Sequence, residues 1–169
     1  RSLFSKTEKE TFFNLSFEKN REDIVMESTV GNESVLLFPL PNVISTLFTE
    51  LFPNVSFVSP LSFLFKRIEQ SALNQKSVLV YSFQYTLFVL ATNGRNIQFL
   101  NSFFVKTDTD CLYYILNSIK QINGDSKTQV EVFGKVDFKT NLMVSLKKYF
   151  ESVNTATFSP KYAVSYTFH

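Results

Sequence analysis

The segment from Ser77 to Ile122 constrains the fold most strongly, because three strand patterns follow one another in it before a helix pattern begins. Residues 78–81 are continuously apolar and residues 86–91 are nearly so, which is typical of strands covered on both faces. Asn93-Gly94 predicts a type I′ hairpin turn, since that turn needs positive φ at both central positions. The segment therefore predicts a meander of three adjacent antiparallel strands.

The rest of this half of the chain alternates helices and strands. Thr107 can cap the helix that follows the meander, and Asp108 and Asp110 suit the positive end of its dipole. The predicted elements after that helix are a strand over 129–133, a helix over 139–152 and an extended segment from 155. Strand, strand, strand, helix, strand, helix, strand is by analogy the order of each half of the ribonuclease H-like and actin-like folds. We therefore predict an α/β protein with a mixed sheet and one complete half of this kind.

The residues before Ser77 contain only fragments of the same order. They predict a helix over 7–17 capped by Thr7, strands over 24–30 and 34–39 around Gly31-Asn32, an amphipathic helix after Pro41, a strand over 55–58 and a helix over 61–73. We therefore expect an incomplete first subdomain over residues 1–75 and a second subdomain over 76–169. Because the sequence begins with Arg1 rather than Met, we expect it to be the C-terminal part of a longer protein.

Composition argues against several classes of function. The formal net charge of +2 is too small to steer nucleic acid, and one Cys with one His cannot form a zinc site. The sequence has no apolar run long enough to span a membrane and no secretory signal pattern, so we expect a cytoplasmic protein. The 20 Phe and 7 Tyr exceed an ordinary aromatic content, and they must either fill the core or meet a partner.

Catalytic groups are also scarce. Cys111 lies in a helical pattern, and we expect it to be a buried apolar residue rather than a nucleophile, because the single His is the terminal residue His169. Asp108 and Asp110 are two positions apart on a helix, so they do not face one another as the paired acids of a nuclease would. Helix capping and the helix dipole explain both acids, and nuclease activity is not expected.

Several short motifs, taken in order, resemble a known family. They are Ser2-Leu3-Phe4, Leu37-Phe38-Pro39-Leu40-Pro41, Phe52-Pro53-Asn54-Val55, Tyr113-Tyr114-Ile115-Leu116 and Val132-Phe133-Gly134. In this order the chain is similar to the uncharacterised bacterial proteins grouped as domain of unknown function 3822 (DUF3822). The resemblance implies an actin-like ATPase fold and additional N-terminal sequence, and it implies no established biochemical role.

The actin-like resemblance directs attention to the turn between the first two strands of a half. In actin-like ATPases that turn presents backbone amides to phosphate, with a Gly for close approach and an Asp that organises the metal. This chain has Ser82-Phe83-Gln84-Tyr85 there, and a single Gly134 followed by Lys135 where the fold has a Gly pair near the nucleoside. Ser82, Gln84, Gly134 and Lys135 are therefore the candidate nucleotide-binding residues.

Two functions remain open from the sequence. The first is a non-catalytic interaction or scaffold module on a degenerate actin-like fold, without catalytic residues, cofactor or metal, that binds a protein partner or a second copy of itself. The alternative is a nucleotide-binding protein or weak ATPase, with ATP as the ligand and a site completed by residues upstream of Arg1. The missing Asp-x-Gly feature favours the interaction module. The expectation of additional N-terminal sequence keeps the nucleotide-binding alternative open.

Overall fold

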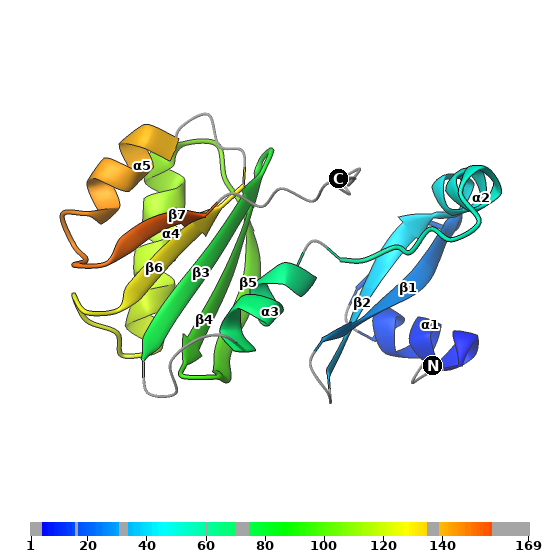
Figure 1. Ribbon diagram of the computed structural model, residues 1–169, viewed down its shortest axis with the longest axis horizontal. Coiled ribbons are helices and arrows are strands. Elements are labelled where there is room, and N and C mark those ends of the chain that lie inside the picture. Colours follow the sequence, from blue (N-terminus) through cyan, green and yellow to red (C-terminus); the bar gives the residue numbers. More distant parts are fainter. Residues whose placement is uncertain are drawn as a thin grey trace. The chain divides into compact units, whose positions relative to one another are not determined.

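A computed structural model describes residues 5–15, 17–30, 34–59, 61–69, 75–134 and 139–156. The chain divides into two units, Arg1–Lys66 and Arg67–His169, whose elements are coloured along the sequence in Figure 1. The predicted mixed-sheet α/β class is confirmed. The predicted turn at Gly31-Asn32 and the candidate residue Lys135 lie outside the described residues.

The first unit is built around one antiparallel hairpin. Its elements are α1 (Lys6–Asn14), β1 (Asp23–Val30), β2 (Ser34–Pro41), α2 (Asn42–Leu51) and the beginning of α3 (Ser62–Glu69). The register of the hairpin runs from the pair Asp23 and Pro41 to the pair Val30 and Ser34. Phe13 of α1 is buried, whereas no residue of α2 is buried, and Val43 and Leu51 of its apolar stripe are exposed.

Two local predictions for this unit are wrong. The cap of α1 is Ser5 rather than Thr7, because the Ser5 hydroxyl accepts the backbone N–H of Glu8 at 3.3 Å and the Glu8 carboxylate accepts the N–H of Ser5 at 2.8 Å. Residues 55–58 form no strand. The segment is instead held to β1 at its end, where the backbone N–H of Ser59 donates to the buried Ser28 hydroxyl at 2.8 Å. A hydrogen bond to a side chain therefore holds the end of this segment, in place of the backbone hydrogen bonds that a strand would make.

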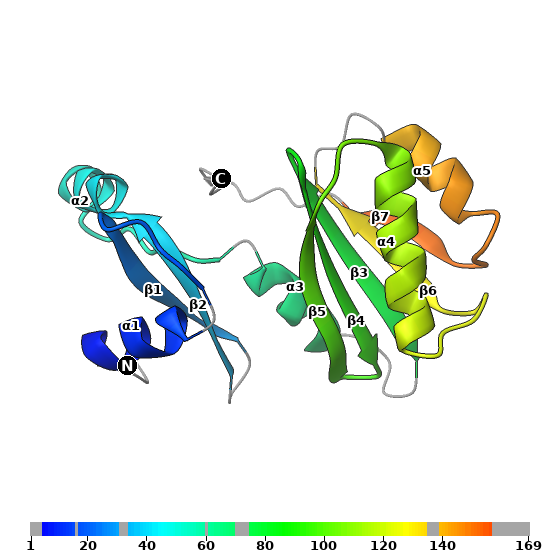
Figure 2. The same cartoon turned by 180° about the vertical axis from the view of Figure 1, so that it is seen from behind.

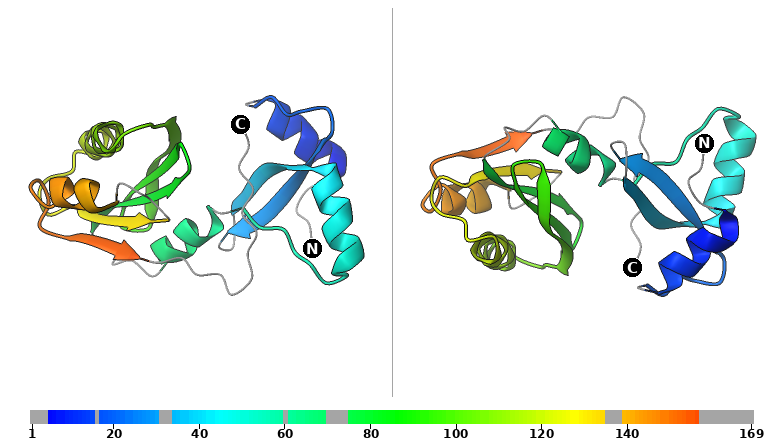
Figure 3. Two further views of the ribbon diagram at one scale, coloured as in Figure 1. Left: turned by 90° about the horizontal axis from the view of Figure 1, so that it is seen from above. Right: turned by 90° about the horizontal axis from the view of Figure 1, so that it is seen from below.

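The second unit contains a five-stranded sheet with two helices. Its elements are β3 (Lys76–Phe83), β4 (Thr86–Asn93), β5 (Asn96–Phe104), α4 (Asp108–Gln121), β6 (Gln129–Phe133), α5 (Lys139–Leu146) and β7 (Val153–Ala156). The strand order is β5-β4-β3-β6-β7, antiparallel from β5 to β3 and parallel from β3 to β7. Both helices lie on one face of the twisted sheet (Figures 2 and 3). The element order from Lys76 is therefore the predicted one.

The core of this unit lies between the sheet and its two helices. Alternate residues of the strands face the helices, among them Val78 and Val80 of β3 and Val130 and Val132 of β6. The helices contribute Ile115 and Ile119 of α4 and Leu142 and Leu146 of α5. Leu79 and Tyr81, on the opposite face of β3, are also buried, so the central strand is covered on both faces as its continuous apolar run predicts.

Candidate functional site

The carboxyl ends of four strands gather at one edge of the five-stranded sheet. β3, β6 and β7 run parallel, and β5 has the same direction because both it and β3 are antiparallel to β4. In open α/β sheets ligands bind outside the carboxyl ends of the strands. The turn after β3, the start of α4 and Gly134 after β6 all belong to this edge, which is therefore the candidate site.

The structure brings Ser82 and Gly134 into direct contact. Ser82 is 1% exposed at the end of β3, and Gly134 directly follows the neighbouring strand β6. The φ angle of Gly134 is +102°, and a Cβ atom at this position would overlap the backbone carbonyl oxygen of Ser82. The absent side chain of Gly134 thus accommodates the neighbouring backbone, which is a packing reason for a glycine.

The turn that carries Gln84 is short and tied to its surroundings. Gln84 and Tyr85 are its two loop residues, because Phe83 pairs with Thr86, and Gln84 is exposed with a φ of +49°. The Tyr85 carbonyl accepts the backbone N–H of Val105 at 2.8 Å. The Tyr85 ring also packs against Phe104 with a centroid separation of 5.9 Å. The turn is therefore fastened to the connection between β5 and α4.

Two acids at the start of α4 have different environments. The Thr107 hydroxyl accepts the backbone N–H of Asp110 at 3.1 Å, and the Asp110 carboxylate accepts the N–H groups of Lys106 and Thr107 at 2.9 and 3.0 Å. These backbone hydrogen bonds lower the pKa of Asp110. Both carboxylate oxygens of Asp108 are buried, and burial raises the pKa of Asp108 although the backbone N–H of Leu142 partly offsets this.

Asp108 is the residue at this edge that sequence reasoning missed. An acid in the first turn of a helix is expected to face solvent and to interact with the positive end of the helix dipole. Asp110 is such an acid, whereas the carboxylate oxygens of Asp108 are buried. No local motif distinguishes the two acids, because the contact that sets Asp108 apart, with the backbone N–H of Leu142, comes from α5, a later element of the chain. The carboxyl group of Asp108 adds an ionisable group to an edge that otherwise presents neutral side chains at Ser82 and Gln84.

Replacing Asp108 with asparagine should stabilise the protein near neutral pH. When the pKa of a carboxyl group is higher in the folded than in the unfolded state, its ionisation lowers the free energy of unfolding as the pH rises through the folded-state pKa. Below the unfolded-state pKa the group is protonated in both states and has no such effect. The gain of Asp108→Asn should therefore be present near pH 7 and shrink toward about pH 3. Urea unfolding at both pH values measures it. Asp110→Asn is the matched control with the opposite sign, since the lowered pKa of Asp110 makes its charge stabilising near neutral pH.

Cys111 is confirmed as a buried residue. It is fully buried in the core beneath α4, and burial, followed by the nearby charges of Asp108 and Asp110, raises the pKa of its thiol to about 12. We expect the folded protein to be inert to a thiol reagent such as iodoacetamide at about pH 8, where an exposed cysteine reacts readily. Mass spectrometry before and after denaturation in urea tests this, and rapid labelling of the folded chain would contradict it.

Neither a metal site nor a membrane-spanning helix is found in the described part of the chain. Its His, Cys, Asp and Glu side chains form no group of three or more that could hold a metal ion. Among the same residues, every helix is too short or too polar to cross a bilayer. A surface hollow exists at the opposite edge of the sheet, around the carboxyl end of α4, and it includes none of the four candidate residues.

Comparisons with known proteins show the family of the chain and its fold. The family described as "Protein of unknown function (DUF3822)" matches residues 1–153. A crystal structure from Bacteroides thetaiotaomicron, described as a protein with actin-like ATPase fold and unknown function, is 23% identical with a TM-score of 0.76. The match covers 91% of this chain and 62% of that one, so the chain spans less than two thirds of the longer protein. No protein with curated annotation matches.

Two further solved structures are similar at a lower level. An AlfA filament bound to AMPPNP is 14% identical with a TM-score of 0.42, and the match covers 89% of this chain and 48% of that one. Pelota from Archaeoglobus fulgidus is 8% identical with a TM-score of 0.38, covering 86% of this chain and 44% of that one. The fold assignment depends on the Bacteroides structure alone, which shows an actin-like ATPase fold for this chain.

Proposed function

Because the chain belongs to the DUF3822 family of proteins of unknown function and has an actin-like ATPase fold, we propose that it is a non-catalytic protein-interaction module. In this proposal the fold serves as a scaffold, and a second copy of the chain pairs with β5, the terminal strand of the sheet that the structure describes. The observation that supports it is the composition of that strand, which carries three phenylalanines and no charged residue.

β5 is the terminal strand of the sheet and pairs with β4 on one side. From Asn96 to Phe104 it carries no charged residue and no proline, which are two of the features by which proteins prevent pairing at an edge. Three of its large apolar side chains are exposed to solvent, and Phe104 is 65% exposed. They are Ile97, Leu100 and Phe104. A long edge strand of this composition favours the addition of another strand.

Both faces of β5 offer aromatic contacts to such a strand. On the helix side, Phe103 stacks on Tyr114 of α4 at a centroid distance of 4.1 Å and on Phe99 at 6.3 Å. On the opposite face, Phe104 contacts Tyr85 and lies under the Lys106 ammonium at 5.5 Å. Cross-strand aromatic pairs contribute roughly 0.2–1 kcal/mol each. An added strand would therefore extend aromatic layers that already exist.

The β5 edge also has a defined usable length. The register between β4 and β5 shifts between Ala91 and Thr92, so Gln98 is the extra residue of a bulge. Bulges interrupt regular pairing and twist a strand. The regular part of the edge is therefore residues 99–104, which is long enough for one partner strand of ordinary length.

The test measures association and nucleotide binding on the same protein. Sedimentation velocity should show concentration-dependent self-association in the range of tens of micromolar, as expected for a small strand-to-strand interface. The double variant Leu100→Lys with Phe104→Lys should abolish it, and Val144→Lys, the same type of change at an exposed site of α5, should not. Equal sedimentation of all three proteins at every concentration would refute the role of β5.

Calorimetry with ATP, ADP and GTP, with and without magnesium, tests the alternative of nucleotide binding. The proposal predicts no heat of nucleotide binding, because the backbones of Ser82 and Gly134 are packed directly against each other. Micromolar ATP binding accompanied by turnover would overturn the non-catalytic assignment. Binding without turnover would favour the nucleotide-binding alternative, with Asp108 as the first residue to substitute.

A further inference from the structure

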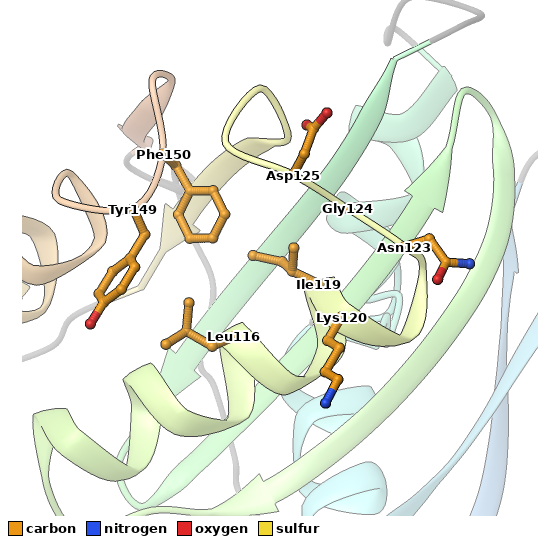
Figure 4. Close-up of a pocket in the computed structure, with 8 residues that line it drawn as sticks. All are labelled: Leu116, Ile119, Lys120, Asn123, Gly124, Asp125, Tyr149 and Phe150. Atoms are coloured by element: carbon orange, nitrogen blue, oxygen red, sulfur yellow. The ribbon is translucent and has the colours of Figure 1, made fainter.

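A surface groove lies at the edge of the second unit's sheet where the parallel strands begin. It has a volume of about 500 Å³ and is open to solvent, between the carboxyl end of α4, the connection from α4 to β6 and the turn after α5. Figure 4 shows the residues that line it: Leu116, Ile119, Lys120, Asn123, Gly124, Asp125, Tyr149 and Phe150. We call it the amino-edge groove, because it lies opposite the carboxyl edge that holds Ser82 and Gly134.

The floor of the amino-edge groove is apolar. Leu116 is half-buried, and Ile119 and Phe150 are buried, so their exposed atoms provide a small non-polar surface. Tyr149 stands at one side with 52% of its surface exposed, and Lys120 stands across the floor from it (Figure 4). Tyr149 lies in the turn after α5, whereas the sequence predicts a helix over 139–152. A half-exposed tyrosine beside an apolar floor is typical of a surface that binds a partner side chain.

The rim of the groove is positively charged. Lys120 is exposed, and the Lys76 ammonium donates to the carbonyl of Asn123 at 2.6 Å, which places a second cation beside a lining residue. Lys127 lies within the α4–β6 connection, two residues after the lining residue Asp125, and Lys147 and Lys148 directly precede Tyr149 in the sequence. All five lysines are free of ion pairs with any residue that the structure describes.

The two acids near the groove are already engaged within the protein. The Asp125 carboxylate accepts the backbone N–H of Lys127 at 3.0 Å, and the Glu151 carboxylate accepts the Ser126 hydroxyl at 3.1 Å. Figure 4 shows the Asp125 side chain turned away from Lys120. Lys120 also offsets the negative end of the α4 dipole, but that end carries only about half a charge. These hydrogen bonds leave both carboxylates charged, so the five lysines and the two acids give a net charge of +3 around the groove, which a negatively charged partner would complement.

We propose that the amino-edge groove binds an acidic peptide segment of a partner protein. One large aromatic or aliphatic side chain of the segment would rest on Leu116, Ile119 and Phe150, and flanking carboxylates would face the lysines of the rim. The open shape suits a side chain of a peptide, because small-molecule sites usually bury most of their ligand. The groove and the β5 edge involve different residues, so peptide binding in the groove can be tested independently of the association at β5.

Fluorescence anisotropy with labelled peptides tests the proposal on the intact chain. The probe is a nonapeptide of sequence EEEFEELEE, and the comparison peptides are EEESEESEE, without the apolar side chains, and KKKFKKLKK, with the charge reversed. We expect the probe to bind at least about tenfold more tightly than either comparison peptide, since both apolar contact and charge are needed. Raising the ionic strength from about 0.05 to about 0.3 M should weaken it several-fold.

Two exposed substitutions locate the binding. Lys120→Glu should weaken the probe about tenfold and Tyr149→Ala about threefold, because one reverses the rim charge and the other removes one wall. Lys66→Glu, the same charge change at an exposed site of α3 outside the groove, should have no effect. Equal binding of the three peptides, equal effects of Lys120→Glu and Lys66→Glu, or no binding up to about 1 mM would each overturn the proposal.

Discussion

Replacing Gly134 with alanine is expected to cost at least about 3 kcal/mol of unfolding free energy, which is a large fraction of the total stability of a domain. An L-residue at a φ of +102° is strained by itself. The added Cβ would also overlap the Ser82 carbonyl oxygen. That oxygen belongs to the central strand β3, which is paired with β4 on one side and β6 on the other, so it has little freedom to move.

Urea unfolding followed by far-ultraviolet circular dichroism measures this loss, since the chain has no tryptophan to serve as a fluorescent reporter. Gly94→Ala is the matched control, because Gly94 also has positive φ, at 59°, in the left-handed region of ordinary hairpin turns. We expect that change to cost only about 1–2 kcal/mol. Equal losses for the two variants would show that the contact with Ser82 does not matter.

Replacing Arg67 with methionine is expected to cost about 2 kcal/mol, because it leaves the carboxylate of Glu131 buried without its cation. The Arg67 Nε atom donates to Glu131 Oε2 at 2.8 Å, and this hydrogen bond raises the pKa of Arg67. The side chain of Glu131 is 7% exposed, whereas that of Arg67 is 43% exposed. The exposure of Arg67 allows water to screen the pair, so the expected loss is smaller than for a fully buried ion pair.

The double variant Arg67→Met with Glu131→Leu tests whether the unpaired carboxylate of Glu131 causes the loss of stability. We expect it to recover most of the stability that Arg67→Met loses, because two apolar side chains leave no unpaired group. A double variant no more stable than Arg67→Met would point to lost packing of the arginine stem instead.

The sequence predicts the second unit well because its strands are encoded by local apolar runs. Residues 78–81 lie in the central strand, and the order from Lys76 to Ala156 is as predicted. The errors there arise where tertiary contacts decide. The β4–β5 loop is Gly94-Arg95 rather than Asn93-Gly94, because Asn93 is still paired with Asn96 of β5. α5 ends at Leu146 rather than Ser152, since the N–H groups of Tyr149 and Phe150 both donate to the Leu146 carbonyl in a turn.

The candidate site is predictable in part. Ser82 and Gly134 are indicated by their places after two strands, and the structure brings them together because those strands are neighbours. Their burial and backbone contact are not visible in the sequence, since they depend on the parallel register of β3 and β6. The contact of Asp108 with the backbone N–H of Leu142 involves α5, which lies about thirty residues later in the chain. A contact between residues so far apart in the sequence leaves no recognisable pattern in the residues around either one.

The position of β3 in the sheet also has a consequence for the order of folding during synthesis. β3, β4 and β5 are joined by two-residue loops, so their meander can form as soon as it leaves the ribosome. The other side of β3 receives its parallel partner β6 only after α4 has been made. Until then the apolar edge at Val78, Leu79 and Val80 is open to other chains. We expect a nascent chain that stops within α4 to depend most on chaperones, and the arrival of β6 to end that dependence.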